Sequence, residues 1–102
     1  MTQQLRVYTM KPGRLDDWVG LFKRGTYPLR TANGFGIQAW TAPDNEQFVW
    51  LVTHEGSRAD FEAADQAYYN LPGHKPIHEE ALLYLEKGES WFLDPVDLGG
   101  GQ

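Results

Sequence analysis

The sequence predicts a small α+β domain, in which a four-stranded antiparallel sheet carries helices on one face. Three observations support this fold class. The chain has 102 residues, which is enough for one small domain with a modest core. Stretches that alternate apolar and polar residues are interspersed with stretches whose apolar residues recur at helical spacing. These stretches follow one another as strand, helix, strand, strand, helix, strand.

The first half of the chain contains one strand and one long helical stretch. Residues 5–10 alternate cleanly and predict the strand. The apolar residues of 15–22 then recur at helical spacing and form one stripe. We expect Gly25 and Pro28 to bend or interrupt this helix. The Asn-Gly pair at 33–34 ends it, because both residues tolerate left-handed backbone angles.

The second half opens with a hairpin. Residues 35–42 and 46–55 read as strands, and the turn-forming sequence between them joins them directly. Ser57 and Asp60 resemble a capping box, with Asp in place of the usual Glu. The remaining expected elements are a helix from this cap to Leu71, a short helix from Pro76 to a Gly88 cap, and a strand at 89–94.

This order of elements is the ferredoxin-like split βαβ arrangement, an antiparallel sheet with helices on one face. We expect a single domain over residues 1–98. The glycine-rich end at 99–102 has nothing to bury, so we expect a disordered tail there.

Composition excludes several classes of partner. The net charge is −5 and there is no run of Lys or Arg, so nucleic acids and anionic membranes are not expected to bind. With no Cys, the chain has no disulfide and no thiolate metal site. The N-terminus does not resemble a signal peptide, and no apolar run approaches membrane-spanning length. We therefore expect a cytoplasmic protein.

The strand at 46–55 has two different apolar faces. Val49, Leu51 and Thr53 form an aliphatic face, which we expect to pack against the helices. Strand parity places the other, aromatic face on the open side of the sheet. The residues expected on that open side are Arg6, Tyr8, Gln38, Trp40, Phe48, Trp50, Val52 and His54. Such an aromatic patch is larger than soluble monomers usually expose, so we expect a homodimer through the open sheet face.

The same residues suggest a small-molecule site, because apolar walls surround a few converging polar groups. Arg6 lies in mid-strand and needs an anion or several acceptors, supplied by a ligand carboxylate, enolate or phenolate, or by a carboxylate across the dimer. Tyr8 and Gln38 would donate hydrogen bonds to the same ligand group. Trp40, Trp50 and Phe48 would bind a planar substrate or would form plain dimer core. His54 is either a general base or a solvated residue at the rim.

Three segments resemble the NIPSNAP-like branch of the dimeric α+β barrel superfamily. They are Leu-Arg-Val-Tyr-Thr-Met-Lys-Pro-Gly-Arg-Leu at 5–15, Phe-Val-Trp-Leu at 48–51 and Tyr-Tyr-Asn-Leu-Pro-Gly-His-Lys at 68–75, and the likeness covers roughly residues 4–96. The resemblance implies a ferredoxin-like protomer and a sheet-to-sheet dimer. The superfamily includes cofactor-free monooxygenases, polyketide and olivetolic-acid-type cyclases, isomerases, dehydratases and haem-handling proteins.

One local match within this resemblance is sharper. The cyclase branch uses a Tyr in the second main helix and a His just after a following Pro as its catalytic pair. Tyr68 and His74, with Pro72 between them, match that spacing. Phe48 stands where such cyclases can carry another His. The monooxygenase and haem-degrading relatives rely on Asn and Trp, whereas the sequence offers no Asn on any expected strand.

These observations lead to a functional hypothesis. We expect a cofactor-independent enzyme that uses acid/base chemistry on a small carbonyl-bearing or aromatic metabolite, as a cyclase, isomerase or monooxygenase. The expected catalytic residues are His74, Tyr68, Arg6, Tyr8 and His54; the expected substrate-binding residues are Gln38, Trp40, Phe48 and Trp50. The alternative is a non-catalytic dimer that binds a hydrophobic ligand or serves in assembly, with His74 an ordinary loop residue.

Metal and haem sites are weakly indicated. The only His pair at helical spacing is His74 and His78, and it straddles Pro76. We therefore expect neither a metal nor another cofactor.

Overall fold

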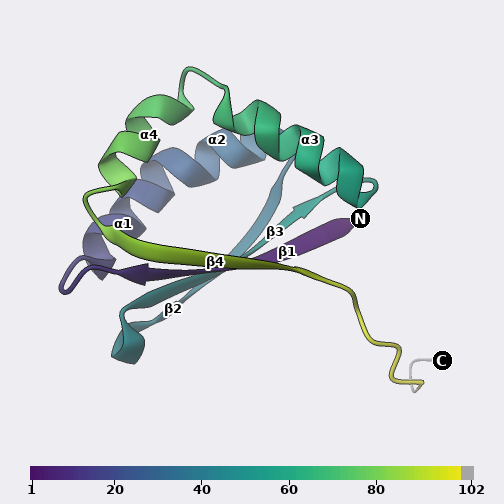
Figure 1. Ribbon diagram of the computed structural model, residues 1–102, viewed down its shortest axis with the longest axis horizontal. Helices are drawn as coiled ribbons and strands as arrows, with labels where there is room; N and C mark the ends of the chain where they lie inside the picture. The colour runs from purple at the N-terminus through teal and green to yellow at the C-terminus, as the bar shows by residue number, and fades with distance from the viewer. Residues whose placement is uncertain (100–102) are drawn as a thin grey trace.

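The computed structural model describes residues 1–99, which form a layer of helices packed on one face of a sheet (Figure 1). The strands are β1 (Thr2–Met10), β2 (Gly36–Ala42), β3 (Gln47–His54) and β4 (Leu85–Leu93). The helices are α1 (Leu15–Leu21), α2 (Tyr27–Ala32), α3 (Arg58–Tyr69) and α4 (His74–Ala81), with a π-helical turn at Phe22–Thr26 and a 3-10 turn at Pro43–Asn45. None of the helices within residues 1–99 is both long and apolar enough to span a membrane.

The sheet order is β2-β3-β1-β4, and the pairs β1–β3, β1–β4 and β2–β3 are all antiparallel. This arrangement confirms the predicted ferredoxin-like α+β fold. The disordered tail expected at 99–102 lies outside the described residues, apart from Gly99, whose N–H donates to Asp97.

The helical stretch after β1 continues past Gly25 and Pro28, where we expected it to bend or to be interrupted, but a π-helical turn replaces regular α-helix just before Pro28. Helix α1 passes through the π-helical turn into α2 without a break. The wider turn just before Pro28 lets helical geometry continue through a residue that cannot donate its backbone N–H. Gly25 permits close helix packing, because a Cβ there would lie 3.0 Å from Cγ1 of Ile77 in α4.

The predicted capping box is confirmed at the start of α3. The Asp60 backbone N–H donates to Ser57 Oγ at 3.2 Å, and the Ser57 N–H donates to Asp60 Oδ2 at 2.8 Å. Gly88, expected as a helix cap, instead lies within β4 and pairs with Tyr8. A Cβ on Gly88 would lie 3.1 Å from the Tyr8 ring, so glycine provides the space for that ring.

The two faces of the central strands are the reverse of those predicted. Arg6 pairs with Trp50 and Tyr8 with Phe48, and these side chains lie under the helices. Only 3% of Phe48 and 1% of Trp50 is exposed, and Val52 is fully buried. The physical reason is packing. The helices present Trp18 and Phe22, whose rings pack edge-on or tilted against Phe48 and Trp50 at centroid distances of 4.6–5.7 Å.

The open face of the sheet is therefore aliphatic in the middle and aromatic at its margins. Its central residues, which share the parity opposite to the buried set, are Leu5, Val7, Val49 and Leu51. Trp40 on β2 and Trp91 on β4 lie on the same face, 53% and 49% exposed. Figure 1 shows no helix over this side of the sheet.

Candidate functional site

A cavity of about 240 Å³ lies between the helices and the covered face of the sheet. We call it the inter-layer cavity. It is lined by residues from β1, β3, the start of β4 and every helix of that layer, namely Tyr8, Trp18, Thr26, Arg30, Trp50, Tyr68, Tyr69, His74, Ile77, His78, Ala81 and Leu85. Aromatic rings make up most of its wall, so a few polar atoms decide what it can bind.

Five polar side-chain atoms around this cavity are buried and have no hydrogen-bond partner within residues 1–99. They are Nε1 of Trp18, Nε1 of Trp50, Nε of Arg30, the Tyr68 hydroxyl and Nδ1 of His74. Buried polar groups are normally hydrogen-bonded, and each one left alone costs about 1–3 kcal/mol. Because these atoms gather around one cavity, the inter-layer cavity is the candidate site.

The loop between α3 and α4 brings Tyr68 and His74 together. Tyr68 lies in the last turn of α3, and Leu71-Pro72-Gly73 turns the chain so that His74 begins α4. The two rings are in contact, with centroids 4.9 Å apart. They are not hydrogen-bonded to each other. Both polar atoms remain available to a ligand.

Burial controls the protonation of this pair. It lowers the pKa of His74 below its usual 6.5, and the neighbouring His78 and Arg30 lower it further, against a smaller opposing effect of Asp65. Burial raises the pKa of Tyr68 above 10, although Arg30 opposes this. At neutral pH the imidazole is therefore neutral and can accept a proton, while the phenol keeps its proton and can donate a hydrogen bond.

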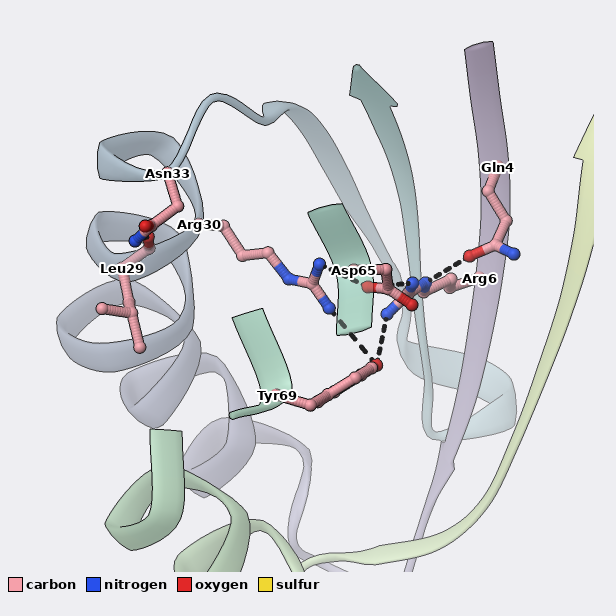
Figure 2. A network of polar contacts seen from close by, with 7 residues as sticks. All are labelled: Gln4, Arg6, Leu29, Arg30, Asn33, Asp65 and Tyr69. Carbon is pink, nitrogen blue, oxygen red and sulfur yellow. Dashed lines mark hydrogen bonds and ion pairs between the residues drawn. The ribbon is translucent and has the colours of Figure 1, made fainter. Parts of the chain in front are cut away.

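Two buried arginines share one carboxylate and one phenol beside the cavity (Figure 2). Arg6 donates from Nη2 to Asp65 Oδ1 at 3.1 Å and from Nη1 to the Tyr69 hydroxyl at 3.0 Å. Arg30 donates to the same two groups, to Asp65 Oδ1 at 2.6 Å and to Tyr69 at 3.3 Å. Nε of Arg6 also donates to Oε1 of Gln4 at 2.7 Å. We call these five residues the two-arginine cluster.

Arg6 thus finds its acceptors within its own chain rather than across a dimer. Burial alone would lower the pKa of Arg6, but Tyr8, Tyr69 and Asp65 outweigh it and raise that pKa, so Arg6 stays charged. Arg6 lines a second cavity of about 270 Å³, which also contacts Asp65 and Ser90. Tyr8 and Tyr69 line both cavities, whereas Arg6 is not among the residues that line the inter-layer cavity.

Tyr8 lies between the two arginines and the aromatic core. Burial raises the pKa of its hydroxyl, against an opposing effect of Arg6, so Tyr8 is a neutral phenol at physiological pH. Its ring stacks edge-on against Trp18 and Trp50.

The other candidates from the sequence lie elsewhere. His54 is at the end of β3, where its Nδ1 is 2.7 Å from the Glu55 carbonyl oxygen, and it does not line the inter-layer cavity. Phe48 and Trp40 line a separate groove with Tyr27 at the β2 edge. Gln38 is exposed on the open face, as its parity predicted. Among residues 1–99, no group of three or more His, Asp or Glu could hold a metal ion.

Sequence reasoning missed Arg30, Asp65 and Tyr69. A signal existed for Asp65, because it falls four residues after Phe61 and three before Tyr68, on the apolar face of the expected helix. An acidic residue on such a face needs a buried partner. Arg30 gave no such signal. Because we expected the helix to be interrupted at Gly25 and Pro28, the helical spacing of residues 15–22 could not be continued to predict which way the Arg30 side chain points.

Comparison with known proteins defines the fold class. No protein-family model matches the sequence, and no curated protein matches it significantly. Solved structures do match. An uncharacterized NIPSNAP domain protein from Burkholderia xenovorans superposes with a TM-score of 0.85 at 18% identity, over 96% of this chain and 97% of that chain.

A NIPSNAP family protein with unknown function from Agrobacterium tumefaciens gives a TM-score of 0.81 at 13% identity, over 96% and 90% of the two chains. A structure described as an antibiotic biosynthesis monooxygenase gives 0.64 at 13% identity, over 95% and 100%. This protein therefore has the fold shared by NIPSNAP domains and that monooxygenase, as the resemblance in its sequence implied.

Proposed function

We propose that this protein is a cofactor-independent enzyme that performs acid/base chemistry on a small carbonyl-bearing or aromatic metabolite within the inter-layer cavity. One observation carries the proposal: Nδ1 of His74 and the Tyr68 hydroxyl, from rings in contact, both lie buried beside the cavity without a partner in residues 1–99. A base and a hydrogen-bond donor close together in an apolar enclosure are what enolisation requires.

The chemistry follows from the protonation states. His74 Nδ1 removes a proton from the carbon next to the substrate carbonyl, and the electron pair of that C–H bond moves onto the carbonyl oxygen. Tyr68 and the indole N–H groups of Trp18 and Trp50 donate hydrogen bonds to the resulting enolate oxygen. In the cyclase outcome the enolate carbon attacks a second carbonyl carbon of the substrate, and the oxygen of that carbonyl takes the proton from His74. In the isomerase outcome the proton returns at another carbon. In the monooxygenase outcome dioxygen is the co-substrate and oxidant: one of its oxygen atoms replaces two substrate hydrogens to form a carbonyl, and the other leaves with those hydrogens as water.

Hydrogen exchange tests this step before the full reaction is known. A panel of small aryl ketones and β-keto acids is incubated with the protein in D2O, and loss of the α-proton signal is followed by ¹H NMR. We expect His74→Gln to slow the exchange catalysed by the native protein by about 10²- to 10⁴-fold. Lys75→Gln, at the exposed neighbouring position on α4, is the matched control. Equal exchange by native protein and His74→Gln would overturn the assignment.

We also propose that the protein is a homodimer through the open sheet face. The support is the uncovered apolar surface formed by Leu5, Val7, Val49 and Leu51 between the half-exposed Trp40 and Trp91. Soluble monomers seldom expose so continuous an apolar patch. This is not the aromatic patch first expected, since Phe48 and Trp50 are buried under the helices.

A non-catalytic ligand-binding dimer is the second candidate. It is favoured by the two-arginine cluster, whose Arg6 already has all three nitrogens paired within the chain. In that case the cavity binds a ligand without converting it. Binding of panel compounds together with no exchange above the buffer rate would select this reading.

A further inference from the structure

We propose that the inter-layer cavity binds its ligand as an anion, a carboxylate, phenolate or enolate carried on a single ring, with Nε of Arg30 and the indole N–H groups of Trp18 and Trp50 as the donors. The inference rests on the proposed function for the place of the site. The inference goes beyond the proposed function by naming the charge and the size of the ligand, and by assigning the binding of the anion to Arg30 instead of Arg6.

The first support is the excess of hydrogen-bond donors in the cavity wall. Indole N–H and guanidinium Nε–H groups can only donate hydrogen bonds, and three of these are unpartnered within residues 1–99. No Asp or Glu is among the residues that line the inter-layer cavity. A ligand that satisfies this wall must therefore supply acceptors, and an oxyanion supplies the most acceptor sites per atom.

The second support is charge. In the two-arginine cluster two guanidinium groups face the single carboxylate of Asp65, which leaves one net positive charge. Arg6 is 5% and Arg30 is 1% exposed, so solvent reaches neither of them well. An unbalanced buried charge is costly, and an anionic ligand next to Arg30 would balance it.

The third support is the fixed orientation of Arg30. Two of its nitrogens are held by Asp65 and Tyr69, which leaves Nε as its unused donor. Its guanidinium carbon lies 3.8 Å from the centre of the Tyr68 ring and 4.7 Å from that of Phe35. A guanidinium clamped in this way offers a donor in one set direction.

Size limits the ligand to one ring. A cavity of about 150 Å³ in a protein interior holds benzene. The inter-layer cavity, at about 240 Å³, has room for a ring with one or two small substituents. Its walls of Tyr8, Trp18, Trp50 and Tyr68 supply the flat surfaces that such a ring contacts.

The test compares benzoate with its neutral isostere benzamide, by titration calorimetry and by tryptophan fluorescence. We expect benzoate to bind at least tenfold more tightly, and Arg30→Gln to abolish this preference. Trp18→Phe and Trp50→Phe keep a ring in place but remove the N–H, and each should weaken benzoate several-fold. These two variants keep the test valid if Arg30→Gln fails to fold. Arg58→Gln, on the exposed surface of α3, and Trp91→Phe, on the open face, are the controls and should leave the affinity for benzoate unchanged.

Equal affinity for the two probes, or no binding of either up to the solubility of benzoate, overturns the inference. The result is separable from the proposed function. Preference for benzoate without proton exchange at the α-carbon supports the anion site and contradicts catalysis. Exchange without such a preference supports catalysis and contradicts the anion site.

Discussion

Both faces of the sheet carry apolar side chains, but the two faces differ in physical character. The covered face, typified by Arg6, Trp50 and Phe48, combines large rings with buried charge and is packed by helices. The open face, typified by Val7 and Leu51, is aliphatic in the middle with Trp40 and Trp91 at its margins, and none of its described ionisable residues is buried. Large side chains and buried polar groups, rather than hydrophobicity, distinguish the face that encloses the candidate site from the face that we propose joins another sheet.

The largest expected effect is on the covered face. Asp65→Asn would leave two buried guanidinium groups without their shared carboxylate, because the amide cannot offset their charge. We expect a loss of about 3–5 kcal/mol in the free energy of unfolding, measured by urea denaturation. Glu62→Gln, on the exposed surface of the same helix, is the control and should change stability by less than about 0.5 kcal/mol. A loss below about 1 kcal/mol for Asp65→Asn would mean that solvent already balances the cluster.

A charge introduced on the open face should weaken dimer assembly and leave the fold of the protomer intact. Leu51→Glu places a charge in the middle of the proposed dimer surface, so we expect the dimer dissociation constant to rise at least about 100-fold, or roughly 2.7 kcal/mol. Analytical ultracentrifugation measures the change, and circular dichroism should show an intact fold. Gln66→Glu, on the exposed side of α3, adds the same charge away from the sheet and should leave assembly unaltered. A native protein that sediments as a monomer would remove the proposed role of this face.

A smaller effect is expected at the cap of α3, the helix that carries Asp65 and Tyr68. Ser57→Ala removes the hydroxyl that accepts the Asp60 N–H, and should cost about 1 kcal/mol of stability. Thermal unfolding measures this loss, with Gln66→Ala in the same helix for comparison. Because the cap belongs to the covered side, dimer affinity should not change. A parallel loss of dimer affinity would show that the two faces are coupled.

The smallest expected effect is the pH dependence contributed by His74. Its pKa is lowered in the folded state, so below about pH 6.5 the unfolded chain binds the proton more readily than the folded one. The contribution of His74 to stability is therefore complete above pH 6.5 and declines as the pH falls through its folded pKa. Urea denaturation of native protein and His74→Gln across pH 5–8 should give curves that converge on the acidic side. Parallel curves would place His74 in solvent in the folded protein.

Much of the fold could be read from the chain because it depends on local pattern. Alternation marked β1 and the hairpin, and the Ser57–Asp60 pair marked the start of α3. Gly88 shows the limit of this approach. A glycine after a helical stretch reads as a cap, but here it lies in β4 because Tyr8 needs its space, and that need arises only between distant segments.

The site was partly predictable for the same reason. Tyr68 and His74 were identified because their spacing resembles the cyclase pair, and both line one cavity. Tyr8 lines the same cavity, but parity had assigned it to the open side of the sheet. Arg30 could not be identified, since its direction depends on a π-helical turn that holds the helix together through Gly25 and Pro28. Trp50 was identified, but was assigned to the wrong side of the sheet.

The sequence by itself determined the order of the elements, the antiparallel sheet and the division of each central strand into an aromatic and an aliphatic face, because alternation along a strand is a local property. Only the tertiary structure decided which of these faces the helices cover. Both faces are apolar enough to be buried, so hydropathy cannot choose between them. The choice depends on Trp18 and Phe22 in the helices, whose rings fit Phe48 and Trp50 of β3, and on Asp65 of α3, which pairs with Arg6 of β1. That fit exists only once the two layers meet.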